Sequence, residues 1–197
     1  MFNQSDEHVI WACFVKGDKK CFELLYQLHY ESLSRYAYKF SQDVLFIEEV
    51  IQDLFIKLWN NRENLNRPDS IKYYLFRALK NLIYNKLKSH SREVYMGDSS
   101  DLLAFELNVE SMFPLDRPDW EELSGKLFCD LTERQKEAIY FLYVEDMSYQ
   151  EIAELLKIKI GGTYKLIYRA VSKIRENTKD LKVGNQAAMT LNVKADM

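Results

Sequence analysis

The stretch Ser70–Arg92, SIKYYLFRALKNLIYNKLKSHSR, decides the fold of the first half of this chain. At the roughly 100° per residue of an α-helix it has one apolar face, formed by Ile71, Leu75, Ala78 and Leu82. The opposite face carries Tyr73, Phe76, Arg77, Lys80, Tyr84 and Lys88. Cations attract phosphates and rings stack on unpaired bases, so this face suits a melted nucleic acid strand. An ordinary amphipathic helix with extended lysine stems has the same pattern.

The composition predicts an all-α protein. The 197 residues are 47% apolar and include 6 glycines and 3 prolines. So few helix-breaking residues favour helices over turn-rich sheets. The chain has no run of about eighteen apolar residues, so we expect no membrane span. We also expect no signal peptide and a cytoplasmic location.

The spacing of cysteines and histidines predicts no metal site and no cofactor. Cys13, Cys21 and Cys129 are odd in number and lack C-x-x-C spacing, so we expect reduced and mostly buried thiols. The three histidines are scattered along the chain, whereas a metal site needs clustered ligands.

The net charge of −3 hides an uneven distribution along the chain. Residues 71–95 carry +5 and residues 156–182 carry +6, whereas residues 96–130 carry −7. Two basic segments on either side of an acidic connector suit two contacts with a single polyanion.

We expect four helices in a first domain of residues 1–92. Ser5 and Asp18 can cap the first two helices, and a long third helix follows Ser41-Gln42-Asp43. The polar segment Asn61–Asp69 contains a proline and is predicted to be a loop before the fourth helix.

The chain after the first domain is predicted to be a linker followed by further helices. Residues 93–118 lack a sustained hydrophobic period and contain glycine and proline, so we interpret them as an acidic linker. A helix is expected within residues 119–129. Residues 183–197 form a tail for which the sequence suggests no role.

Two capping boxes predict a helix-turn-helix within residues 119–182. They are Thr132-Glu133-Arg134-Gln135 and Ser148-Tyr149-Gln150-Glu151. A third helix, expected over Ile160–Glu176, is basic. Two short helices joined by a tight turn, with a basic helix second, are typical of DNA binding, although a generic helical hairpin has a similar pattern.

Taken together, these segments resemble a bacterial RNA polymerase sigma factor of the extracytoplasmic-function group in the sigma-70 superfamily. The matching segments are Phe22-x-x-Leu25-Tyr26-x-x-His29-Tyr30, Arg35-Tyr36-Ala37, Val50 to Trp59, Tyr74 to Asn81, Leu131 to Gln135, Ser148 to Leu156 and Arg169-Ala170. The resemblance implies two small helical domains, a four-helix promoter-melting domain and a helix-turn-helix domain, joined by the acidic linker. It implies a factor that binds core RNA polymerase, directs it to promoters and helps to melt the minus-ten element.

The resemblance also implies roles for the first domain. The helix matching Val50–Trp59 would dock on the clamp helices of the largest polymerase subunit. The residues that we assign to this contact are Gln52, Asp53, Phe55, Lys57 and Trp59. The helix at Ser70–Lys88 would read the minus-ten element, and the loop before it would capture a flipped base. The residues that we assign to minus-ten DNA are Asn61, Arg62, Asn64, Tyr73, Phe76, Arg77, Lys80, Asn81, Tyr84 and Lys88.

For the second domain, the resemblance implies contact with the polymerase flap region and with minus-thirty-five DNA. The residues that we assign to that DNA are Ser148, Tyr149, Gly161, Gly162, Thr163, Tyr164, Lys165, Tyr168 and Arg169. The linker would run toward the RNA exit channel. Relatives are often restrained by an anti-sigma factor, so either such a factor or a DNA-bound recruiting protein is a further expected partner.

The sequence departs from the family pattern in the turn before the last helix. Lys157 stands where the family has a glycine, and Lys159 stands where it has a capping serine. Gly161-Gly162 then opens the recognition helix. In one interpretation the glycines let the backbone approach phosphates, and Thr163, Tyr164 and Lys165 read the DNA. In the other, the minus-thirty-five contact is weak and a DNA-bound protein helps to select the promoter.

Two alternatives from other classes remain. A helix-turn-helix regulator that never joins polymerase would share the second domain but would not need the segment Val50–Trp59. A helical enzyme acting on nucleic acid would need a reactive site. The sequence has no phosphate-binding glycine loop, no H-E-x-x-H and no nucleophile elbow, so we do not expect an enzyme.

Overall fold

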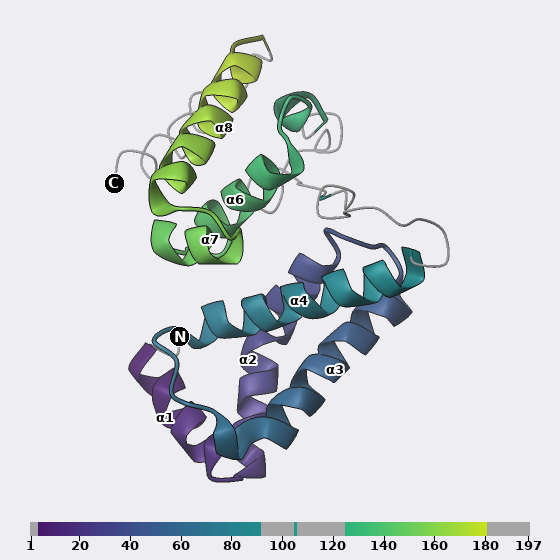
Figure 1. Cartoon of the computed structure of the whole chain (residues 1–197), viewed down its shortest axis with the longest axis vertical. Coiled ribbons are helices and arrows are strands. Elements are labelled where there is room, and N and C mark those ends of the chain that lie inside the picture. The colour runs from purple at the N-terminus through teal and green to yellow at the C-terminus, as the bar shows by residue number, and fades with distance from the viewer. Residues whose placement is uncertain (1–3, 92–104, 106–124, 181–197) are drawn as a thin grey trace. The chain divides into compact units, whose positions relative to one another are not determined.

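The computed structural model describes residues 4–91, 105 and 125–180. The chain divides into two compact units, Met1–Ser100 and Asp101–Met197, which we describe separately (Figure 1). All regular structure among the described residues is helical, as the sequence predicts. None of these helices has the length and apolar character needed to cross a membrane. The tail at 183–197 and most of the expected linker lie outside the described residues.

The helices of the first unit begin close to the positions that the sequence predicts. They are α1 (Gln4–Val15), α2 (Lys19–Ala37), α3 (Val44–Asn61), the 3-10 helix η1 (Arg62–Asn64) and α4 (Ile71–Ser91). Asp18 caps α2 by accepting a hydrogen bond from the backbone N–H of Lys20 at 2.8 Å, and Asp43 caps α3 in the same way. Ser70 accepts a backbone bond in the first turn of α4 at 3.1 Å. Helix α1 begins at Gln4, so Ser5 lies inside it and not before its first residue.

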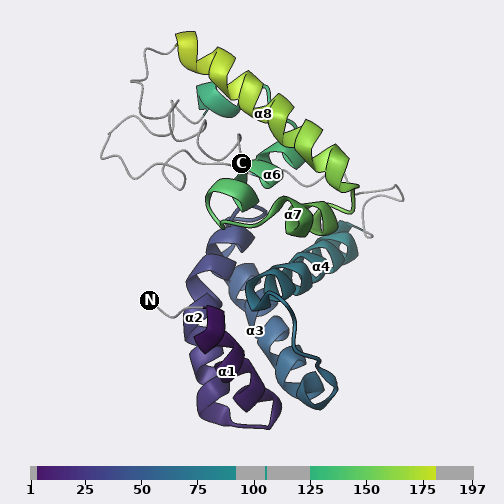
Figure 2. The ribbon, with the colours of Figure 1, turned by 90° about the vertical axis from the view of Figure 1, so that its left-hand side faces the viewer.

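Aromatic rings join the four α-helices of the first unit into one core. Helix α4 lies against α2 and α3 in both views (Figures 1 and 2). The edge-to-face pairs between helices include Trp11–Tyr74, Tyr36–Phe76 and Phe22–Phe55, whose ring centroids are 5.5, 5.3 and 5.9 Å apart. Each pair of this kind contributes about 0.5–1.5 kcal/mol beyond the burial of its area. The core therefore holds α4, and the polar side of that helix, in a fixed orientation.

The buried side of α4 is wider than the sequence predicts. Its buried residues are Ile71, Leu75, Phe76, Leu79, Leu82 and Ile83. The prediction that Phe76 lies on the exposed face is wrong, because its side chain is 0% exposed. Helix α4 packs against α2 as well as α3. The apolar side of the helix must therefore be wider than it would be against a single neighbour.

The second unit has the predicted helix-turn-helix. Its helices are α6 (Glu133–Tyr143), α7 (Tyr149–Leu155) and α8 (Ile160–Asp180). Residues 125–128 are also helical, within the helix expected at 119–129. Both capping boxes are confirmed. The N–H of Thr132 donates to Oε1 of Gln135 at 3.0 Å, and the N–H of Ser148 donates to Oε2 of Glu151 at 2.8 Å.

Helix α7 ends in a left-handed turn at Lys157, where φ is 53°. The N–H of Lys157 bonds to the carbonyl of Glu154 at 3.2 Å, and the N–H of Ile158 bonds to the carbonyl of Ala153 at 2.9 Å. This pair of bonds is the Schellman arrangement, in which glycine is the preferred residue at the left-handed position. Lys157 therefore holds a conformation that costs an L-amino acid roughly 1–2 kcal/mol.

We expect Lys157→Gly to stabilise the second unit by about 1 kcal/mol, since glycine adopts positive φ without that cost. The measurement is the free energy of opening from hydrogen exchange of the α6 and α8 core amides in the full chain. Lys159→Gly is the matched control, because it removes the same charge where φ is not positive. An equal gain in both variants would show that charge, and not backbone strain, is responsible.

Phe105, from the segment expected to be a linker, packs into the second unit. Its ring is 2% exposed and meets Tyr140 of α6 edge to face, with centroids 5.7 Å apart. Its backbone N–H donates to a carboxylate oxygen of Glu133. The segment is therefore anchored on α6 at this residue.

Candidate nucleic-acid interface

The polar side of α4 carries a stripe of alternating rings and cations, which we call the α4 stripe: Tyr73, Arg77, Lys80, Tyr84 and Lys88. Arg77 donates to the hydroxyl of Tyr73 at 3.4 Å, and the ammonium of Lys80 lies 5.6 Å from the ring centroid of Tyr84. Arg77 and Lys88 are exposed, and the other three side chains are half-buried. The half-buried rings of Tyr73 and Tyr84 are held against the core. The stripe therefore offers ring surfaces of fixed orientation between the cations.

Asn81 is exposed next to the α4 stripe, one residue after Lys80. Of the residues assigned to minus-ten DNA on this helix, Phe76 alone is buried among those described, and we leave it out of the interface. The helix thus brings the remaining assigned residues to one side, where cations and rings can meet a strand together.

The loop residues assigned to minus-ten DNA are held in different ways. Asn61 and Asn64 are exposed, and the side-chain amide of Asn61 donates to the carbonyl of Lys57 at 2.9 Å. Arg62 lies over the ring of Trp59, with its guanidinium carbon 4.6 Å from the centroid, and donates to the Trp59 carbonyl at 2.8 Å. Arg62 is therefore held against Trp59 at the start of the loop, whereas the side chains of Asn61 and Asn64 are exposed to solvent.

The residues assigned to polymerase contact lie on two sides of α3. Gln52 and Lys57 are exposed, and Trp59 is half-buried. Phe55 is 3% exposed and packs against the ring of Tyr26, so the structure places it in the core and not on the docking face. The assignment of Phe55 to polymerase contact is therefore wrong in this structure, because the side chain is buried.

Asp53 is also part of an ion-pair network that joins α3 to α4. The ammonium of Lys86 lies 2.6 Å from Glu49 and 2.9 Å from Asp53. Burial disfavours the charge on Lys86, but its hydrogen bonds to the two carboxylates outweigh burial and raise its pKa. A substitution of Asp53 could therefore weaken binding in two ways: by removing a contact with polymerase, or by releasing Lys86 from its ion pair. A test of Asp53 must separate the two.

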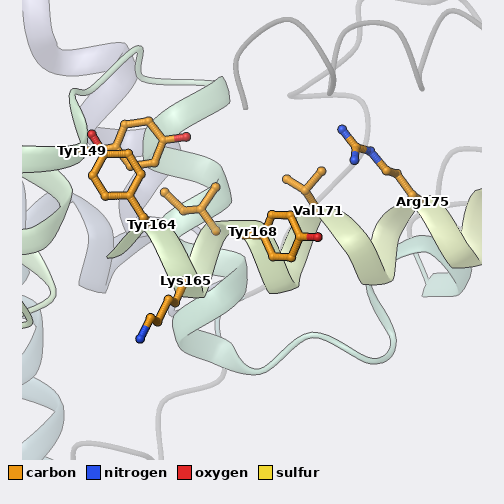
Figure 3. Close-up of a pocket in the computed structure, with 7 residues that line it drawn as sticks. Tyr149, Tyr164, Lys165, Tyr168, Val171 and Arg175 are labelled. Atoms are coloured by element: carbon orange, nitrogen blue, oxygen red, sulfur yellow. The ribbon is translucent and has the colours of Figure 1, made fainter. Parts of the chain in front are cut away.

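The helix-turn-helix presents a stacked pair of tyrosines. The rings of Tyr149 on α7 and Tyr164 on α8 are 4.3 Å apart and inclined by 14° (Figure 3). Tyr164 and Tyr168 are 50% and 70% exposed, and Lys165 and Arg169 are exposed beside them. The recognition helix therefore displays large aromatic and cationic side chains directly after its two glycines.

Thr163 does not belong to this exposed surface. Its side chain is 0% exposed, and its hydroxyl donates to the carbonyl of Lys159 at 3.5 Å. The prediction that it reads DNA is wrong in this conformation, because it faces the core from the first turn of α8. Gly161 and Gly162 are exposed, and a β-carbon at Gly161 would meet nothing within 4 Å. Ser148 is exposed and is used in the capping box.

A groove of about 340 Å³ runs along α8 beside the tyrosine pair (Figure 3). Its lining includes Ile167, Val171 and Arg175, which the sequence analysis did not single out. The helical spacing of the sequence could have predicted part of this lining. One face has the spacing i, i+4, i+7 and i+11, occupied by Tyr164, Tyr168, Val171 and Arg175. The groove therefore extends along α8 beyond the predicted site, over buried Ile167 and Val171 to half-buried Arg175.

Comparisons with known proteins match a segment in each of the two units. The family model described as Sigma-70 region 2 matches residues 25–93, and the model described as Sigma-70, region 4 matches residues 126–174. The ECF RNA polymerase sigma-E factor of Escherichia coli strain K12 is 30% identical over 196 residues, which cover 92% of this chain and 98% of that protein. The chain belongs to the extracytoplasmic-function group of the sigma-70 family.

This sigma factor is a transcription initiation factor with sigma regions 2 and 4. It is also similar to the ECF RNA polymerase sigma factor SigW of Bacillus subtilis, with 21% identity over 174 residues that cover 84% of this chain and 93% of SigW. The sigma factor RpoE of Bartonella quintana, solved with the anti-sigma factor NepR, has the same fold. It matches with a TM-score of 0.60 and 24% identity, over 81% of this chain and 98% of that chain.

Proposed function

We propose that the sigma factor docks on core RNA polymerase through α3 and holds a melted minus-ten strand on the α4 stripe. The observation that carries this proposal is the alternation of rings and cations on a helix whose other side is locked in the core. Binding here makes and breaks no covalent bond. Extruding a base costs a few kcal/mol, and stacking on a ring returns about 1–3 kcal/mol per base.

In this proposal residues 1–92 are the docking and melting domain, and residues 119–182 are the minus-thirty-five reader. Residues 93–118 connect them as a linker, with Phe105 holding the linker to α6. Exposed Tyr164, Lys165, Tyr168 and Arg169 support the DNA contact of the second domain. The protein acts in the cytoplasm, where the polymerase is, and catalyses no reaction itself.

We also propose that an anti-sigma factor restrains this protein. Two structures with the same fold support the idea, since RpoE was solved with the anti-sigma factor NepR and CnrH with the cytosolic domain of CnrY. CnrH matches with a TM-score of 0.56 and 17% identity, over 88% of this chain and 97% of that chain. A DNA-bound recruiting protein is the other way to control such a factor.

Asp53→Ala should weaken binding to core polymerase about tenfold, the effect of losing one well-placed interface group. The measurement is capture of purified core polymerase by the immobilised full-length protein. Glu49→Ala is the matched control, because it removes the other carboxylate that holds Lys86. Equal weakening in both variants would assign the effect to Lys86 and contradict docking through Asp53. Failure of both the wild type and the variants to capture polymerase would instead favour a regulator that never joins it.

A further inference from the structure

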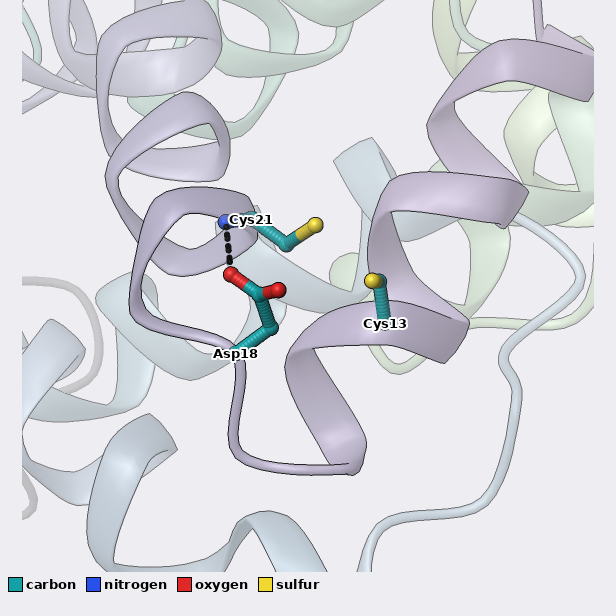
Figure 4. A group of neighbouring side chains, drawn as sticks. All are labelled: Cys13, Asp18 and Cys21. Carbon is teal, nitrogen blue, oxygen red and sulfur yellow. Dashed lines mark hydrogen bonds between the residues drawn. The ribbon is translucent and has the colours of Figure 1, made fainter.

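The corner between α1 and α2 gathers three groups that can bind a metal ion: Cys13, Asp18 and Cys21. Their sulfur and carboxylate oxygen atoms all lie within 4.8 Å of one another. Cys13 comes from α1, Asp18 from the connecting loop and Cys21 from the first turn of α2 (Figure 4). The sequence analysis expected no such cluster, because the spacing C-x4-D-x2-C becomes compact only when the two helices fold back on each other.

The carboxylate of Asp18 is already oriented. Its Oδ1 atom accepts hydrogen bonds from the backbone N–H groups of Lys20 at 2.8 Å and Cys21 at 3.2 Å. Both bonds use the same oxygen, so Oδ2 can bind an ion without breaking the helix cap. Hydrogen bonds that hold a ligating carboxylate in this way are a regular feature of metal sites.

The two thiols are half-buried and lie close to each other. Hydrogen bonding to Cys13, then burial, then the nearby negative charge of Asp18 raise the pKa of Cys21 to about 11. When a divalent cation binds, each coordinating thiol is deprotonated and its proton goes to solvent.

The surroundings balance the charge of a loaded site. Two thiolates and one carboxylate around a dication leave one negative charge. Lys16, Lys19 and Lys20 flank the three ligands in the same loop and first turn. Asp18 and Cys21 also lie at the N-terminal end of α2, where the helix dipole favours negative charge.

We propose that Cys13, Asp18 and Cys21 bind one Zn²⁺ ion, with a fourth position left for water. Zinc accepts sulfur at about 2.3 Å and carboxylate oxygen at about 2.0–2.2 Å, so two sulfurs on one ion lie about 3.8 Å apart. The donor atoms all lie within 4.8 Å of one another, so on binding they would approach by up to about 1 Å. The ion would join α1 to α2. Arg62 of η1 lies beside the connecting loop, since a β-carbon at Gly17 would be 3.7 Å from its Nε.

The test is a metal titration of the reduced, full-length protein. Zn²⁺ is added in competition with a coloured chelator, and Co²⁺ is added separately to detect thiolate-to-cobalt charge-transfer absorption. We expect one ion per chain in the wild type. We expect a loss of affinity of at least tenfold in Cys13→Ser, Cys21→Ser and Asp18→Asn, within the range of roughly 10–100-fold for disturbed metal sites.

The variants are chosen so that loss of binding is not loss of fold. Asparagine is as good a helix cap as aspartate, so Asp18→Asn keeps α2 but removes the charged ligand. Cys129→Ser is the matched control, because Cys129 is exposed and lies in the other unit. Far-UV circular dichroism checks the helical content of each variant.

Three results would overturn the proposal. One is wild-type binding no tighter than that of the Cys13→Ser variant. Another is unchanged binding in Asp18→Asn, which would exclude the carboxylate as a ligand. The third is a Cys13–Cys21 disulfide in the isolated protein, together with no metal uptake after reduction. Metal binding is measured without polymerase or DNA, so the outcome is independent of the function proposed above.

Discussion

Alanine at Arg77, Lys80 and Lys88 together should weaken binding of the polymerase–sigma complex to premelted minus-ten DNA by roughly a hundredfold. Each cation lies on the α4 stripe, where a phosphate contact at an exposed site contributes about 1 kcal/mol, and about 3 kcal/mol is a hundredfold or more. The slope of log affinity against log salt should also fall by about 2, since each single-strand phosphate contact contributes about 0.7. The measurement is a titration of promoter DNA with an open minus-ten bubble at several salt concentrations.

The matched control for this triple variant is alanine at Lys16, Lys19 and Lys20. It removes the same number of cations from the same unit, but from the α1–α2 corner. If both triple variants lose affinity equally, the effect is one of net charge and the α4 stripe is not the binding surface. An unchanged salt slope in the first variant would contradict phosphate contacts by these three residues.

The sequence predicted helix boundaries well because the groups that set them are local. Asp18, Asp43, Thr132 and Ser148 each bond to backbone within three residues, so a single sequence contains the whole interaction. The positive φ at Lys157 agrees with the family resemblance, since the family has glycine at this position. The features of this fold that a single sequence can predict are therefore local hydrogen bonds and local backbone geometry.

The sequence could not show how many neighbours each helix has. Phe76 and Thr163 are beside or among polar residues, and each is buried because a second or third helix packs against that side. The stacking of Tyr149 on Tyr164 and the cluster of Cys13 with Cys21 depend on how two helices fold back at a corner. These tertiary contacts decide which of the predicted site residues can reach a partner.

Scrambling the minus-thirty-five sequence should lower transcription by purified polymerase with this sigma factor tenfold or more. The expectation rests on the exposed Tyr164 and Lys165, since each mismatched base pair in a specific site costs about 1–3 kcal/mol. The double variant Tyr164→Ala, Lys165→Ala should then respond much less to scrambling than the wild type. Tyr164→Phe is the matched control for the tyrosine, because it keeps the ring that stacks on Tyr149.

The same experiment decides between the two interpretations of Gly161-Gly162. If the glycines allow the backbone to approach phosphates, Gly161→Ala should weaken DNA binding although it stabilises α8 by up to about 1 kcal/mol, since a β-carbon there meets no protein atom within 4 Å. Opposite changes in stability and binding cannot come from misfolding, so they would assign the glycine to DNA contact. A wild-type protein that transcribes equally well from intact and scrambled promoters would contradict this interpretation. It would mean that the α4 stripe and a DNA-bound recruiting protein select the promoter.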